Sequence, residues 1–142
     1  MAGQPPPDRS SSAAPGDGAP SNANFRVFLG EREVGFLQVS RLQLDVAIAA
    51  AVKSPEPPTL VLRRAMGRSR ELFEWADGEA NQVHDRRQVT LQQLDATGQA
   101  VVNTFVLTNC RPTRWAGPAL DASDDGVPLE EIEIAYDRLV WR

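Results

Sequence analysis

Few residues of this chain could do chemistry: one histidine, one cysteine and a group of arginines. His84 stands beside Asp85, and a His–Asp pair activates a serine nucleophile in many hydrolases. No nucleophile motif or metal-ligand cluster accompanies the pair, which favours a surface loop histidine. Cys110 has no second cysteine or activating base near it in sequence, which favours a buried filler over a nucleophile. We therefore predict no catalytic, cofactor-binding or metal-binding residues and no enzymatic activity.

Charged residues form two blocks of opposite sign. Ordinary solvated charge explains both blocks, but a sharper hypothesis is that they meet between copies and set a head-to-tail register. The sequence Arg64–Arg68 lacks the spacing and the lysine of a phosphate-binding loop. A nucleic-acid groove has little support, because few aromatic residues lie among the arginines. The basic block comprises Arg63, Arg64, Arg68, Arg70, Arg86 and Arg87, and the acidic block Asp121, Asp124, Asp125, Glu130, Glu131, Glu133 and Asp137.

Size and composition fit one globular domain. The chain has 142 residues, 42% of them hydrophobic, and a net charge of −4, which argues against a dedicated nucleic-acid binder. A single cysteine cannot form an internal disulfide, so a reducing compartment such as the cytosol is expected. No apolar run approaches the ~20 residues that span a bilayer, and no secretory signal is evident.

The first 24 residues differ in composition from the rest. Residues 2–24 carry five prolines, several serines and glycines, and none of the large aliphatic or aromatic residues Val, Ile, Leu, Phe, Trp and Tyr. Such a segment cannot offset its ordering entropy by burial. We predict a disordered Pro/Ser/Gly-rich arm over 1–24, either a solvated tail or a tether that docks onto a neighbour, and a folded domain over 25–142.

The first half of the domain reads mainly as β-structure. Strands are expected at Phe25–Leu29, after which Gly30 opens a tight turn, and at Val34–Leu44. Asp45–Val52 is rich in alanine, which favours helix, but its period-two pattern leads us to assign a strand. Thr59–Arg64 follows three prolines and is also read as a strand.

One short helix should follow. Ser69 can accept a hydrogen bond from the first amides of the helix, Glu71 suits its positive end, and Gly78 is a plausible stop. The stripe of Leu72, Phe73, Trp75 and Ala76 must hold it by packing.

The second half continues as strands. They are expected at Arg86–Asp95, at Val101–Thr108 after a turn with Gly98 at positive φ, and at Leu129–Val140, where Ile132 and Ile134 share a face. The three tryptophans, Trp75, Trp115 and Trp141, are expected to anchor the core or an interface. The fold class is therefore mainly β with one helix.

An ordered set of motifs resembles the tail tube proteins of contractile phages and of phage-like extracellular contractile injection systems. The resemblance covers about Phe25 to Leu139, and no single motif is diagnostic. The motifs are Phe25–Val27, the glycine turn, Val34–Leu42, Thr59–Arg64, the Trp75 helix, Arg86–Arg87, Leu94–Asp95 with Gly98, Asn109 with Pro112, Trp115 with Gly117–Pro118, and Glu130–Leu139.

The resemblance implies a compact β-sandwich or barrel with a flanking helix. It implies hexameric rings that stack head to tail into the inner tube, or its initiating ring, inside a contractile sheath. Sheath and baseplate proteins are the implied partners, assembly is cytoplasmic, and the product is part of a virion-like or extracellular particle. No nucleic acid or cofactor is needed.

Two departures from the family pattern leave an alternative open. Arg41 stands where the family usually has glycine, and the interval from Leu42 to Thr59 is short. A trimmed hairpin could line a lumen with Ala47, Ala49 and Ala51, or could mark a ring at the baseplate or tube end. The alternative function is a binding or adaptor module that does not assemble with itself.

Overall fold

The described part of the chain folds into eight antiparallel strands and one helix. The computed structural model describes residues 18–44 and 57–142. Hydrogen-bonded neighbours follow the order β2-β1-β5-β6-β7-β4-β3, and β8 also pairs with β6. The elements are β1 (Pro20–Leu29), β2 (Arg32–Val34), β3 (Gln38–Val39), β4 (Thr59–Ala65), α1 (Glu71–Ala80), β5 (Arg87–Asp95), β6 (Val101–Ala116), β7 (Leu129–Ala135) and β8 (Arg138–Trp141).

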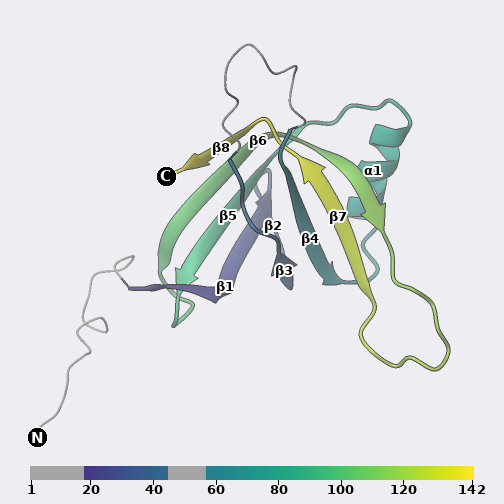
Figure 1. Ribbon diagram of the computed structural model, residues 1–142, viewed down its shortest axis with the longest axis horizontal. Coiled ribbons are helices and arrows are strands. Elements are labelled where there is room, and N and C mark those ends of the chain that lie inside the picture. Colours follow the sequence, from purple (N-terminus) through teal and green to yellow (C-terminus); the bar gives the residue numbers. More distant parts are fainter. Residues whose placement is uncertain (1–17, 45–56) are drawn as a thin grey trace, which may run out of the picture.

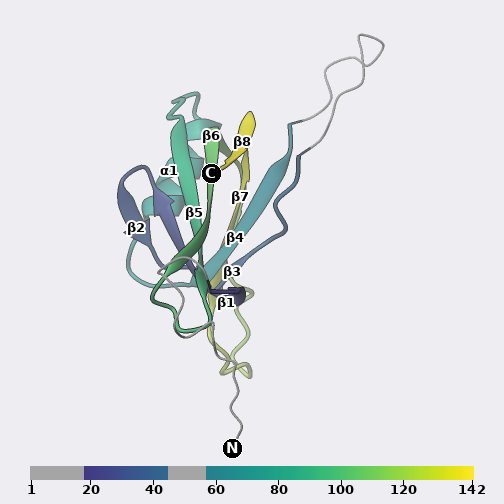
Figure 2. The same cartoon turned by 90° about the vertical axis from the view of Figure 1, so that its left-hand side faces the viewer.

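The long strand β6 belongs to both halves of a sandwich. Its first part pairs with β5 and β8 in what we call the first sheet, β2-β1-β5-β6-β8. Its second part pairs with β7 in the second sheet, β6-β7-β4-β3. Asn109 has a φ of 55° where the strand passes from one sheet to the other. Figure 1 shows the first sheet on the left and β7, β4 and α1 on the right, and Figure 2 shows β4 and β3 leaning away from β1 and β5.

The core lies between the two sheets because alternate residues of each strand point inward. Val27, Leu29, Val89 and Leu107 come from the first sheet, and all are almost completely buried. The second sheet contributes Leu60, Leu62, Ile132 and Ile134, each with no exposed surface. This architecture confirms the predicted mainly β sandwich with a flanking helix.

Helix α1 is held against the sandwich by its apolar stripe. Leu72 and Trp75 are buried, and the ring of Phe73 packs edge-on against Trp115 of β6 at 5.1 Å between centroids. The amide of Glu71 donates to Oγ of Ser69 at 3.3 Å, as the sequence predicts. The stop predicted at Gly78 is wrong: the helix runs on to Ala80, because the amides of Asn81 and Val83 bond back to the carbonyl of Gly78. Gln82, at a φ of 69°, then turns the chain away.

Three predicted strands have other bounds. Val34–Leu44 is not one strand, because the chain leaves the edge of the first sheet after β2 and joins the edge of the second as the two-residue β3. The strand expected at Val101–Thr108 extends to Ala116. The strand expected at Leu129–Val140 is two strands: β7 pairs in the second sheet, whereas Asp137 bonds to Thr108 and β8 joins the first.

Three more predictions concern the turn at Gly98, the start of the first strand and the strand at Asp45–Val52. The turn at Gly98 is confirmed, with a φ of 75° and the Asp95 carboxylate accepting bonds from Thr97 and Gln99. The first strand begins at Pro20, five residues before the expected domain start. The strand predicted at Asp45–Val52, with Ala47, Ala49 and Ala51, lies outside the described residues.

Candidate functional site

His84 and Asp85 are not arranged for hydrolysis. The ring Nδ1 of His84 lies 3.3 Å from Oε2 of Glu79, and the imidazole is half exposed. The carboxylate of Asp85 instead accepts bonds of 2.9 and 3.1 Å from Arg87. Across residues 18–44 and 57–142, no group of three or more His, Cys, Asp or Glu side chains could hold a metal ion.

Cys110 is a buried packing residue. It has no exposed surface, and its Sγ donates to the carbonyl of Leu107 at 3.4 Å. Burial raises the pKa of the thiol to about 12, so the nucleophilic thiolate is scarce at neutral pH.

The basic and acidic blocks meet within one chain, and the hypothesis that they meet between copies stays a prediction. Strands β4 and β7 pair in a register that sets Arg63 opposite Glu131 and Arg64 opposite Glu130. The resulting ion pairs measure 2.6 and 2.8 Å. Glu131 also binds Arg114 on β6 at 2.5 Å, so its carboxylate links three strands. Cross-strand pairing thus uses much of the charge expected at an interface.

The sequence reasoning missed the burial of Glu130. This residue is only 2% exposed, because it shares the inward face of β7 with Ile132 and Ile134. The period-two pattern of the segment already placed it on that face. In the acidic loop that follows β6, Asp121, Asp124 and Asp125 form no ion pair with any described residue.

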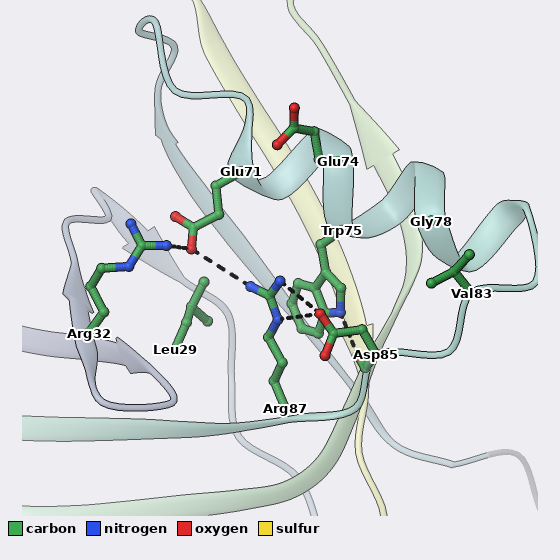
Figure 3. A pocket seen from close by; sticks show the side chains of 9 residues that line it. All are labelled: Leu29, Arg32, Glu71, Glu74, Trp75, Gly78, Val83, Asp85 and Arg87. Atoms are coloured by element: carbon green, nitrogen blue, oxygen red, sulfur yellow. Dashed lines mark hydrogen bonds and ion pairs between the residues drawn. The ribbon is translucent and has the colours of Figure 1, made fainter.

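A pocket between α1 and the first sheet contains a chain of charges (Figure 3). Arg87 lies between Glu71, at 3.7 Å, and Asp85, while Arg32 forms a further ion pair with Glu71. The guanidinium of Arg87 also sits 4.7 Å from the ring centroid of Trp75, whose Nε1 donates to the Asp85 carbonyl at 2.7 Å. The two arginines and the two carboxylates neutralise one another, and their ion pairs hold the helix against the sheet.

The inward face of the first sheet is only partly covered. Val27, Leu91, Phe105 and Trp141 are neighbours in register across β1, β5, β6 and β8. Val27 is 1% exposed and Leu91 6%, whereas Trp141, at the sheet edge, is 68% exposed. The rings of Phe105 and Trp141 stack at 5.7 Å. The apolar row therefore extends beyond the cover that the second sheet provides.

A groove lies over this uncovered part, and we call it the Phe105 groove. Phe25, Leu37, Gln93 and Phe105 line it, and Leu37 is 64% exposed. The segment 37–42, which contains β3 and the stretch that runs upward after it in Figure 1, forms its other wall. A hydrogen-bond chain leads to one of its lining residues: Trp141 Nε1 donates to Asn103 at 3.1 Å, and Asn103 donates to Gln93 at 2.9 Å.

The three tryptophans thus have different surroundings. Trp75 is buried, and Trp115 is half-buried between Phe73 and Glu130. Trp141 lies largely in solvent. The predicted anchoring in the core therefore describes Trp75 and Trp115, and Trp141 is left as a candidate interface residue. Among the described residues, no helix is long and apolar enough to cross a membrane.

Two sheets that share a bent strand, one flanking helix and a partly uncovered apolar face together define a β-sandwich domain. The model of the T4-like virus tail tube protein gp19 family matches residues 21–140, and the chain therefore belongs to that family. This match confirms the resemblance seen in the sequence. No curated protein sequence matches the chain.

Solved structures share the fold at low sequence identity. A chain of the extended sheath–tube complex of the extracellular contractile injection system PVC superposes with a TM-score of 0.65 and 21% identity, over 84% of this chain and 88% of that one. A chain of the anti-feeding prophage tube-terminating cap gives 0.71 and 18%, over 95% and 98%. A chain of the PVC sheath/tube terminator gives 0.68 and 19%, over 100% and 99%.

Proposed function

We propose that this chain is a structural subunit of the inner tube of a contractile phage tail-like injection particle. Copies form hexameric rings that stack head to tail, and sheath and baseplate proteins are their partners. Assembly takes place in the cytoplasm and yields part of a virion-like or extracellular particle. Neither nucleic acid nor a cofactor is required, and the subunit performs no enzymatic reaction. Membership of the tail tube family supports this assignment.

The uncovered apolar row of the first sheet carries the self-assembly part of the proposal. Trp141 belongs to the edge strand β8, which pairs with β6 on one side, and its indole is fixed by Asn103. An exposed, oriented aromatic residue beside an apolar groove is the usual centre of a protein interface. A neighbouring subunit that covers Phe105 and Trp141 would complete the core that the second sheet leaves open.

A terminal ring of the tube is the second candidate. The superpositions on chains of the cap and terminator structures cover almost all of this chain and almost all of the other chain. The superposition on the sheath–tube chain leaves part of each chain uncovered. The short interval between Leu42 and Thr59 favours the same candidate. Stack length separates the two, because a tube subunit makes long stacks of rings and a terminal subunit makes single rings or short stacks.

Sedimentation velocity on the full-length chain tests the proposed interface. We expect a species of six chain masses, and the Trp141→Ala variant should need a concentration at least ~30-fold higher to assemble, because an interface hot spot contributes about 2 kcal/mol or more. Leu120→Ala is the matched control, since Leu120 is 93% exposed and lies in the acidic loop. Its assembly should equal that of the wild type. A chain that stays monomeric at all concentrations would favour the alternative of a non-assembling adaptor module.

A further inference from the structure

Strand β6 changes sheets at a β-bulge. Gln88 of β5 faces two residues of β6, Thr108 and Asn109, because the register between the strands shifts by one residue at this point. Such a bulge bends its strand and increases the local twist. Asn109 takes the left-handed position of the bulge, with a φ of 55°. Glycine is common at this position, because the left-handed region disfavours other L-residues.

The chain returns to the first sheet beside this bulge. β7 ends at Ala135, and β8 begins at Arg138, which pairs with Thr108. Between the two strands, the amide of Asp137 donates to the carbonyl of Thr108 at 3.0 Å. This place lies where β8 starts beside β6, at the top of Figure 1. Two passages of the chain between the sheets therefore meet at one point.

The carboxylate of Asp137 holds the two passages together. Its Oδ2 accepts a hydrogen bond from Nδ2 of Asn109, and its Oδ1 accepts one of 2.8 Å from Nη1 of Arg111. The same Nη1 donates to the carbonyl of Asn109 at 2.9 Å, which closes a ring of three residues. The bonds from Asn109 and then from Arg111 hold the pKa of Asp137 below its ordinary value, so the carboxylate is ionised at neutral pH.

This ring of hydrogen bonds explains how a residue other than glycine stays in the bulge. Asparagine adopts the left-handed conformation more readily than most residues, because its short side chain can form local hydrogen bonds. In Asn109 that bond goes to Asp137, which belongs to the return passage. A change in the φ of Asn109 would disturb its bonds to both Asp137 and Arg111. The backbone of the bulge is therefore tied to the return passage.

We propose that Asp137 is a positioning residue that sets the angle between the two sheets. By holding Asn109 in the left-handed region, it fixes the residue at which β6 bends from the first sheet into the second. This role rests on the geometry of the hydrogen-bond ring alone. Its consequence for assembly rests on the proposed function: copies that close a ring must present their sheets at one common angle, so a looser joint makes the rings less regular.

Hydrogen exchange tests the role in four full-length chains: the wild type, Asp137→Ala, Asn109→Gly and the double variant. Glycine reaches the left-handed region readily, so Asp137 should matter mainly when residue 109 is asparagine. With Asn109 present, we expect Asp137→Ala to lower the protection factor of the amide at position 137 on the order of ten-fold. With glycine at position 109, the loss should be much smaller.

An internal control accompanies each of these samples. The amide of Arg142 bonds to Thr104 at the far end of β8 and should keep its protection in all four chains. An equal loss at position 137 in both backgrounds would mean that Asp137 acts without Asn109. That result, or no loss in either background, overturns the proposal.

A distance measurement reports on the angle itself. Nitroxides at Thr104→Cys and Thr113→Cys lie on β6 before and after the bulge, and the buried thiol of Cys110 does not compete for the reagent. In dilute, monomeric protein, electron–electron resonance should give a narrow distance distribution, which Asp137→Ala broadens. Asp121→Ala is the matched control, because the Asp121 carboxylate bonds to a serine of the acidic loop, and it should leave the distribution narrow. Equal widths in all three samples overturn the proposal.

Electron microscopy then separates this inference from the proposed function. Rings of the Asp137→Ala chain should show a less regular six-fold symmetry than rings of the Asp121→Ala chain. Equally regular rings would overturn the consequence for assembly. If no chain forms rings, the wild type included, the proposed function fails, while exchange and distances still decide whether Asp137 sets the joint.

Discussion

The indole Nε1 of Trp115 donates a 2.9 Å hydrogen bond to Oε1 of Glu130, a carboxylate with almost no exposed surface. The other oxygen of Glu130 accepts a 2.8 Å bond from Nε of Arg64. Arg64 in turn stacks over Phe36, 5.8 Å from its ring centroid. This buried network joins β4, β6 and β7, so the second sheet depends on charges as well as on apolar packing.

Removing one partner of this network should be costly. We expect Glu130→Ala to lower the free energy of unfolding by about 3–5 kcal/mol, because it leaves the Arg64 charge buried without compensation. Glu31→Ala is the control: Glu31 is exposed and forms no ion pair with any described residue, so its change should stay within about 0.5 kcal/mol. Urea unfolding of the two variants measures the difference. A loss at Glu130 as small as that at Glu31 would contradict the role of the network.

In the second sheet, the sequence predicts which residues of a strand point inward better than it predicts the charged contacts that they make. Alternation placed Ile132 and Ile134 inward, and the same alternation placed Glu130 beside them. A carboxylate there is stable only because Arg64 and Trp115 come from other strands, which no local pattern reveals. The division of Leu129–Val140 into β7 and β8 has the same cause, since it depends on the pairing of Asp137 with Thr108 far along the chain.

Short sequence motifs gave correct predictions where the backbone geometry of a few consecutive residues determines the structure. Gly98 was identified as a turn glycine because positive φ favours glycine wherever it occurs. The helix stop at Gly78 failed because glycine is also tolerated inside a helix, and Gln82 makes the turn instead. The groove over Phe105 could not be predicted, because it depends on where the second sheet stops covering the first.

Acid should weaken the fold through Glu131. Hydrogen bonds from Arg63, and then from Arg114, hold the pKa of this carboxyl below its ordinary value of 4.5. A lowered folded-state pKa stabilises the fold above the unfolded pKa, and this contribution is lost as the pH falls through the folded pKa. The free energy of unfolding should therefore fall below about pH 4.5.

The variant Glu131→Gln tests that assignment. It removes the titrating group, so its free energy of unfolding should depend less steeply on pH in the acid range, as measured by urea midpoints between about pH 6 and pH 2. Asp95, Asp121 and Asp137 also have lowered pKa values and contribute to the slope that remains. If the variant shows the same slope as the wild type, Glu131 is not a source of the acid sensitivity.

Cys110 should be unreactive until the chain unfolds. Its thiol has a pKa raised to about 12 by burial, so very little thiolate forms at pH 8. Iodoacetamide labelling followed by mass spectrometry should be slow in native buffer and fast in urea, with a native rate that increases in the destabilised Glu130→Ala variant. Rapid, complete labelling of the folded wild type would show that this part of the core is open to solvent.

Negative-stain electron microscopy of the purified full-length chain tests the central claim, assembly into rings, most directly. The proposed function predicts class averages with six-fold symmetry and a central opening, and side views in which rings stack on a common axis. Particles that remain single compact subunits at high concentration, without rings in any class, would contradict it.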